Sequence, residues 1–172
     1  MGRTTSIGWG RGGVFVSVGW DGHKYGTSHL IGEYIFLGQP VLADSAMVTW
    51  ALRADYRWVL FLDSYEVPLG DVELGVPGVS IALPVGDLFV AWAPAVEGDR
   101  CCVWLVGSDA AGEKVFKELC PPIATSDDRL VVAITGEKKQ CLVVTTTDAA
   151  LVHKWPILAD GSLGDEIKPS TQ

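Results

Sequence analysis

The chain has 172 residues, 48% hydrophobic and 20% charged, with a formal net charge of -8. This apolar content excludes intrinsic disorder, because the chain can bury enough surface to offset the entropy cost of ordering it. The length predicts a single domain over residues 1–172. The acidic balance argues against a nucleic-acid partner, since phosphate contacts need clustered Lys and Arg.

The start of the sequence, Met1 to Ser6, leads into glycines and not into an apolar stretch. We therefore expect a cytoplasmic protein, with the mature form of an exported protein as the alternative. The most apolar window, residues 79–96, contains Pro84 and Pro94, so we expect no membrane-spanning helix. The cysteines at 101, 102, 120 and 141 lack zinc-site spacing, which predicts free thiols. A Cys102–Cys120 bridge is the alternative in an exported protein.

Internal repeats dominate the sequence. An apolar segment ending in Asp recurs over residues 14–21, 56–63, 102–109 and 141–148, so the terminal aspartates return at similar intervals. The apolar segments before them begin at Met47, Phe89 and Val131, which are equally spaced. A period of about 40 residues with several short strands per unit is typical of β-propeller blades. The predicted units cover residues 4–42, 46–86, 87–127 and 129–169.

The middle of each Asp-terminated segment is apolar at adjacent positions, as in Trp58-Val59, Trp104-Leu105 and Val143-Val144. Since neighbouring strand residues point to opposite faces, these strands are expected to be covered on both sides. Residues 110–119 are predicted to form a third strand and not a helix, because Gly112 interrupts the helical pattern. The sequence thus predicts an all-β fold of four sheet repeats of about 42 residues, closed like a small β-propeller or a related closed β architecture. The four units would form either a complete small ring or half of a larger ring that a second chain completes. A three-unit β-trefoil competes, but the fourth unit argues against it.

The last unit, residues 130–168, resembles a blade of the lactonase and WD40 class of β-propellers, above all in the segment HKWPILADGSLG at 153–164. No unit has the Gly-His and Trp-Asp pairs of a WD40 repeat at their usual places, and Trp20-Asp21 instead ends a predicted strand. The resemblance implies a fold and no catalytic residue.

Candidate chemistry is sparse. The repeated Asp21, Asp63, Asp109 and Asp148 would bind a hard cation if they ringed a channel, but turn-capping is the preferred interpretation. His23, His29 and His153 would approach one another only if the ring closed. No nucleophile elbow is present, so we expect no enzyme, no cofactor and no metal. Four tryptophans at repeat-equivalent strand positions are predicted to be core residues, and three near strand ends are candidates for exposed contacts: Trp50, Trp58, Trp92 and Trp104, then Trp9, Trp20 and Trp155.

These observations favour a non-enzymatic protein-binding module, such as an acidic inhibitor or immunity-type protein that occludes a partner's active site. Its partner is expected to carry a basic face, and the chain to be a monomer or homodimer. A glycan-binding lectin-like propeller and a small metal-dependent hydrolase or lactonase are the alternatives. The predicted partner-binding residues lie in three turns and combine acidic and aromatic side chains: Tyr65, Glu66, Asp71, Glu97, Asp99, Ser108 and Asp109.

Overall fold

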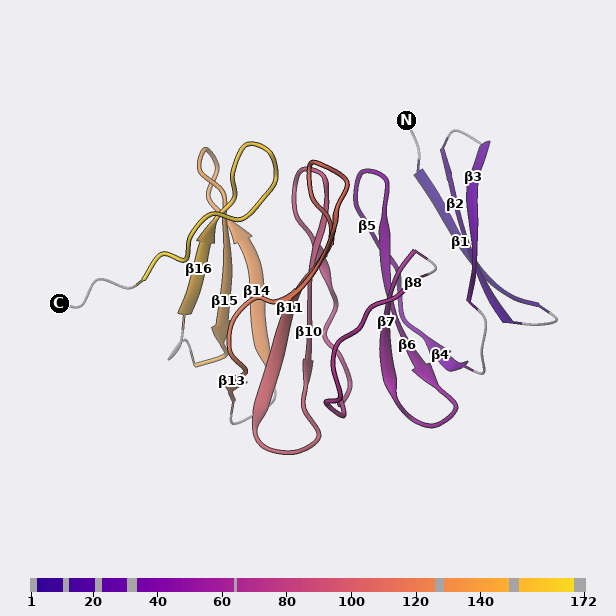
Figure 1. Ribbon diagram of the computed structural model, residues 1–172, viewed down its shortest axis with the longest axis horizontal. Coiled ribbons are helices and arrows are strands. Elements are labelled where there is room, and N and C mark those ends of the chain that lie inside the picture. Colours follow the sequence, from indigo (N-terminus) through magenta and orange to yellow (C-terminus); the bar gives the residue numbers. More distant parts are fainter. Residues whose placement is uncertain are drawn as a thin grey trace.

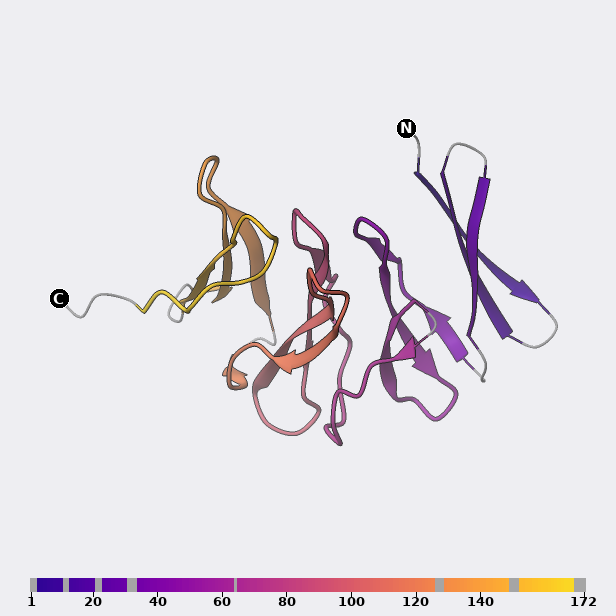
Figure 2. The same cartoon turned by 45° about the horizontal axis from the view of Figure 1, so that its top comes forward.

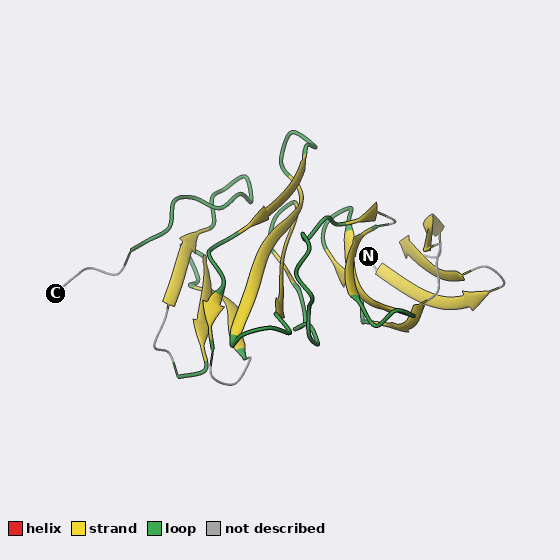
Figure 3. Ribbon diagram, turned by 60° about the horizontal axis from the view of Figure 1, so that its bottom comes forward, coloured by secondary structure: helices red, strands yellow, loops and turns green. Residues whose placement is uncertain are grey.

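The computed structural model describes residues 3–10, 13–20, 23–30, 34–63, 65–125, 129–148 and 152–168, with the backbone alone for residue 37 and those before 36. These residues form antiparallel β-sheets and contain no helix (Figure 3). The predicted all-β class is therefore confirmed. Among the described residues there is accordingly no helix with the length and apolar character needed to cross a bilayer.

The strands group into four sheets that follow one another along the chain (Figure 1). The first sheet contains β1 (Arg3–Gly10), β2 (Gly13–Trp20) and β3 (His23–Leu30). The second contains β4 (Tyr34–Leu37), β5 (Val41–Leu42), β6 (Met47–Arg53), β7 (Trp58–Leu62) and β8 (Tyr65–Glu66). The third contains β9 (Ile81–Ala82), β10 (Asp87–Pro94), β11 (Arg100–Ser108), β12 (Lys114–Glu118) and β13 (Ile123–Ala124). The fourth contains β14 (Leu130–Thr135), β15 (Cys141–Thr146) and β16 (Val152–Pro156).

The four sheets form an open row. Figures 1 and 2 place the first sheet and the fourth sheet at opposite ends, with the other two between them. The closed architecture expected from four repeats is not observed among the described strands. The sequence period indicates that the units are alike. Ring closure depends on the angle between neighbouring sheets, and the length of the repeat does not determine that angle. His153 in β16 consequently lies far along the row from β3, which carries His23 and His29.

Sheet boundaries differ from the predicted units. Residues 34–42 were expected to end the first unit, but β4 and β5 both pair with β6 of the second sheet. Likewise β9 pairs with β10 of the third sheet although it falls within predicted unit 46–86. Residues 38–40 separate β4 from β5, and β9 has only two residues, so neither sheet edge appears in the sequence as a continuous apolar run.

The third sheet is covered on both faces, as its sequence predicts. Alternate residues of β10 and β11 enter two separate cores. The core shared with the second sheet contains Val48, Trp50, Leu60, Leu62, Phe89, Ala91, Ala93, Cys102, Trp104 and Val106. The core shared with the fourth sheet contains Leu83, Leu88, Val90, Val103, Leu105, Cys120, Ile123, Leu142, Val144 and Trp155.

The fourth sheet is shifted by one residue relative to the sequence repeat. Phe89 is fully buried and faces the second sheet, which precedes it in the row. Val131, its counterpart in the sequence repeat, is 46% exposed, while Leu130 and Val132 pack toward the third sheet. Since side chains alternate along a strand, a shift of one residue exchanges the two faces. Val131 therefore points to the outer end of the row.

The loops of neighbouring sheets also hold one another. The carboxylate of Asp87 accepts hydrogen bonds from the backbone N–H groups of Ser45 (2.7 Å) and Ala46 (3.0 Å) and from the Ser45 hydroxyl. In return, Gly86 donates its backbone N–H to the Asp44 carboxylate at 3.0 Å. Ser45 and Asp87 lie one repeat apart in the sequence, so equivalent loops of successive repeats cap each other.

Candidate binding site

A long connection without regular secondary structure joins the second and third sheets. This crossing segment, residues 67–80, starts beside β7, where Val67 donates its N–H to Leu60 O at 2.8 Å. It ends beside β10, where Gly78 donates to Trp92 O at 3.1 Å. Its Val67, Leu74 and Ser80 are buried and most residues between them are exposed. Structureless connections of this length are uncommon in compact domains and are often functional.

Glycine makes the close approach at the end of this segment possible. A Cβ atom on Gly78 would lie 2.1 Å from Nε1 of Trp92, which no side chain tolerates without displacement of the indole. Gly38 has the same role one repeat earlier, where its N–H donates to Trp50 O at 2.7 Å. Glycine thus lets the backbone at the edges of the second and third sheets lie close to the equivalent residues Trp50 and Trp92.

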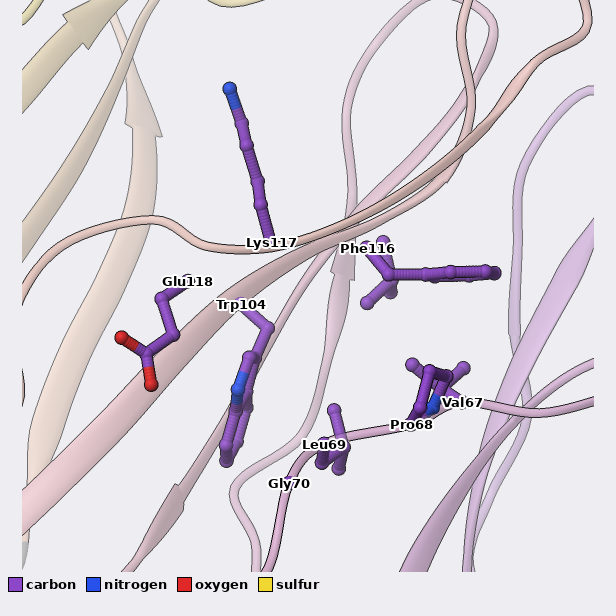
Figure 4. Close-up of a pocket in the computed structure, with 9 residues that line it drawn as sticks. Val67, Pro68, Leu69, Gly70, Trp104, Phe116, Lys117 and Glu118 are labelled. Atoms are coloured by element: carbon purple, nitrogen blue, oxygen red, sulfur yellow. The ribbon is translucent and has the colours of Figure 1, made fainter.

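Three cavities lie along the crossing segment. The one at its start measures about 240 Å³ and is shown in Figure 4. Leu69 and Trp104 border it on one side and Phe116 faces it from β12, while the Lys117 ammonium points away. Beside it, Tyr65 stacks on Phe116 with ring centroids 5.6 Å apart, and Lys114 Nζ lies 5.0 Å from the centre of the Tyr65 ring.

The middle cavity is charged. It measures about 350 Å³ and is lined by the β6–β7 turn and residues 70–74 of the crossing segment. Arg53 and Arg57 contribute cations, and Glu66, Asp71 and Glu73 contribute carboxylates. Within this group, Arg53 lies 3.9 Å from Glu66, measured from Nη1 to Oε1. The cavity therefore has more carboxylates than cations in its lining.

The cavity at the end of the segment is apolar and aromatic. This aromatic pocket of about 240 Å³ is formed by the edge of the second sheet and residues 76–80: Phe36, Gly38, Gln39, Val41, Val48, Trp50, Trp58, Val76, Pro77, Gly78, Val79 and Ser80. Trp50 donates its indole N–H to Ser80 Oγ at 3.1 Å, which fixes the ring. Phe36 meets Trp58 edge to face at 5.8 Å. Trp58 also lines the charged cavity, so the two cavities adjoin across this side chain.

Exposed apolar side chains gather at the rim of the aromatic pocket. Val76 is 75% exposed, Val79 is 74% exposed and Phe36 is 51% exposed. Isolated exposed apolar residues are common, but a group of them around an apolar hollow marks an interaction site. None of these three residues was predicted from the sequence. The available signal was the V-P-L-G-D-V-E-L-G-V-P-G-V run over residues 67–79, which is rich in valine but too interrupted for a strand.

The predicted partner-binding residues do not form one surface. Tyr65, Glu66 and Asp71 lie near the crossing segment, the first in the aromatic stack and the other two at the charged cavity. Ser108 and Asp109 lie at one end of the β10–β11 pair, where Asp87 pairs with Ser108. Glu97 and Asp99 lie in the turn at the opposite end, beyond the Pro94–Cys101 pair.

The predicted turn-capping is seen at Asp109, which accepts the N–H groups of Ala111 and Glu113, both at 2.9 Å. Asp63 instead accepts the N–H of Met47 at the start of β6, at 3.1 Å. Asp148 accepts the hydroxyl of Thr146, which precedes it in the chain. Asp21 lies outside the described residues. In the described part of the chain, no three His, Cys, Asp or Glu side chains gather as a metal site would require.

The remaining candidate residues have structural surroundings. Trp50 and Trp104 are buried as predicted, and Trp58 and Trp92 are half-buried. Trp155 was a candidate for exposed contacts but is only 5% exposed. It stacks on His153, which in turn lies 2.6 Å from the Glu166 carboxylate. The side chains of Trp9, Trp20, His23 and His29 lie outside the described part of the structure.

All four cysteines are free thiols, as expected, and Cys101, Cys102 and Cys120 are buried. Burial, assisted by the negative charges of Glu166 and Glu118, raises the pKa of Cys120 to about 11. Such a thiol is protonated and unreactive at neutral pH.

Comparisons of the chain with models of protein families, with curated proteins and with solved structures gave no match. A function must therefore rest on the geometry and chemistry of the site itself.

Proposed function

We propose that this protein is a non-enzymatic binding module that contacts another protein through the aromatic pocket and the crossing segment. The observation that supports this most directly is the exposure of Phe36, Val76 and Val79 around an apolar hollow bordered by Trp50 and Trp58. Interfaces depend on a few apolar or aromatic anchors that fill desolvated pockets. In this proposal, one apolar side chain of the partner occupies the aromatic pocket.

The charged cavity supplies the second part of the proposal. It adjoins the aromatic pocket across Trp58 and contains Glu66 and Asp71. A partner with a basic face would place cationic groups near these carboxylates, and the net charge of -8 would accelerate its approach. An acidic inhibitor or immunity-type protein, which covers the active site of its partner, fits these properties.

The fold proposed with this function is propeller-like. The second, third and fourth sheets stack face to face in chain order, as propeller blades do, and the row of sheets stays open (Figure 1). Such a scaffold is rigid because the third sheet is buried on both faces. The crossing segment, which joins two blades, then presents its exposed residues from fixed ends.

The test compares two variants that each add one aspartate. Val76→Asp places charge at the rim of the pocket, and Val85→Asp places it at a 47% exposed valine in the β9–β10 turn, outside the lining of the three cavities. The wild type and Val85→Asp are expected to retain a basic protein from a lysate of the native host, and Val76→Asp is expected to lose it. Thermal unfolding should be similar for the three proteins, because both side chains are exposed. Equal retention by Val76→Asp would contradict the proposal.

A further inference from the structure

The outer face of the fourth sheet has the composition of a buried surface. Residues that alternate with the core positions of β14, β15 and β16 point away from the third sheet: Val131, Ala133, Thr135, Cys141, Val143, Thr145, Val152, Lys154 and Pro156. This set, the outer face, includes no carboxylate although the chain has 21 Asp and Glu residues. A solvated sheet face is normally polar at these positions.

Burial on this face is incomplete in the single chain. Val131 is 46% exposed and Val152 is 44% exposed, while Val143 at the centre of the face is half-buried. The hydroxyl of Thr145 donates to the backbone carbonyl of Thr146 at 3.2 Å, so this polar group already has a partner within its own strand. The face therefore exposes apolar area to water.

We propose that the outer face packs against the same face of a second copy of this chain, related by a twofold axis. Neighbouring sheets cover both faces of the third sheet. A second copy would cover the outer face of the fourth sheet in the same way and so continue the row. Two sheet faces of equal size and similar twist pack well at about 30° with a spacing of about 10 Å. A twofold contact also needs only one self-complementary surface, which is why it is the commonest kind of oligomer.

Charge supports a second copy over a different partner. An outer face without carboxylates gives a basic partner nothing to bind, and its single charged residue, Lys154, lies on edge strand β16. Two copies with a net charge of -8 each repel one another in general. They approach most easily through a surface that lacks negative charge, and salt should strengthen the contact by screening the remaining repulsion.

The size of the face sets the strength of the contact. Three strands about 4.8 Å apart and about 17 Å long give a footprint of about 240 Å², well below the roughly 800 Å² per partner of a stable interface. We therefore expect a weak dimer that dissociates in the range of about 10 to 1,000 µM. The dimer should therefore form only at high protein concentration, and salt should strengthen it. Salt should instead weaken the complex of the proposed function, which separates the two interactions.

Sedimentation velocity over this concentration range tests the proposal. The wild type and Val96→Asp are expected to shift from monomer to dimer, more completely at high salt. Val131→Asp, at an exposed position that tolerates charge in the monomer, should raise the dissociation constant at least about tenfold. Val143→Asp should have a larger effect, but it is informative only if its circular dichroism spectrum shows a folded protein, so Val131→Asp is the deciding variant.

Cross-linking locates the contact. Cys141 lies on the outer face, whereas the other three cysteines are buried. A short bismaleimide should therefore join two chains through Cys141 at high concentration, and Cys141→Ser or Val131→Asp should abolish the product. A monomer at every concentration would overturn the proposal, as would a dimer that is unaffected by Val131→Asp.

Discussion

The carboxylate of Asp87 in the third sheet accepts the backbone N–H of Ser45 in the second sheet at 2.7 Å. The same carboxylate also accepts the N–H of Ala46 and the hydroxyl of Ser45. One side chain thus satisfies two backbone donors and one hydroxyl of the preceding repeat. These bonds hold together two loops that are distant in the sequence.

Replacing Asp87 by Ala should lower the free energy of unfolding by about 1 to 3 kcal/mol, because backbone donors lose a charged acceptor. Urea denaturation measures this change. Ser45→Ala should cost less, since it removes the hydroxyl and leaves both backbone bonds. Glu97→Ala, at an exposed position in the β10–β11 turn, is the matched control and should be nearly neutral. Equal stability of Asp87→Ala and wild type would contradict the role given to this contact.

Asp63 gives a prediction about pH. Burial raises the pKa of this carboxyl above its ordinary value of 3.8, Asp87 adds to the shift, and the Met47 hydrogen bond and Lys114 oppose it. The folded protein therefore holds this proton more tightly than the unfolded chain does. It follows that the contribution of Asp63 to stability is largest below the unfolded pKa and is lost as the pH rises through the folded pKa.

Asp63→Asn should remove this pH-dependent loss. Asparagine keeps an acceptor for the Met47 N–H and tolerates the positive φ of 53° at this position. We expect the variant to be at least as stable as the wild type at pH 7, with an advantage that disappears below pH 3.8. Asp63→Ala is the control, because it loses the acceptor and should be less stable at both pH values. Thermal unfolding across this pH range decides between these outcomes.

The thiols should differ sharply in reactivity. Cys120 is buried with a pKa of about 11, and Cys101 and Cys102 are also buried, whereas Cys141 is partly exposed. Since thiolates are the reactive form, a thiol reagent at pH 8 and low protein concentration should label one cysteine per chain rapidly. Cys141→Ser should abolish the rapid phase, and unfolding should release all four thiols. Rapid labelling of more than one cysteine in the native protein would show that the core between the sheets opens.

Asp109 and Glu66 should respond differently to substitution although both were predicted contact residues. Asp109 accepts two backbone hydrogen bonds in its own turn, so Asp109→Ala should destabilise the protein by about 1 kcal/mol. Glu66 makes an exposed pair with Arg53, so Glu66→Ala should change stability by less than about 1 kcal/mol. If Glu66 contributes to the charged cavity as proposed, its replacement should instead weaken partner binding. Calorimetry and a binding assay on the same two variants separate these effects.

The strands themselves could be predicted well from the sequence. The Asp-terminated segments at 56–63 and 102–109 correspond to β7 and β11, and residues 110–119 contain β12 as a third strand. Paired apolar residues such as Trp104 and Leu105 correctly indicated a sheet buried on both faces. The pair Val143-Val144 predicted the same for β15, but only Val144 packs in a core between sheets, because in the described part of the chain no further sheet follows the fourth to cover Val143. These features depend on local composition and alternation, which a sequence shows directly.

Features that depend on relative position could not be predicted in the same way. Phe89 and Val131 occupy the same position in the sequence repeat, but they lie on opposite faces of their sheets. The number of residues between them does not reveal this shift of one residue, because it does not show which face a side chain occupies. The aromatic pocket combines Phe36 with Val76, which are far apart in the sequence and meet only because the crossing segment follows the edge of the sheet. Neither residue belongs to a motif, so only the fold brings them together.

The open row makes this protein nearly one-dimensional in its energetics. The third sheet has a neighbour on each side, whereas the described residues cover only one face of the fourth sheet. Stability is then a sum of nearest-neighbour terms, and unfolding proceeds more easily from an end than from the middle. The fourth sheet should accordingly exchange its amide hydrogens sooner than β10 and β11 do. A chain without the fourth sheet would expose Leu105, and its unfolding should become less cooperative while the remaining sheets still form.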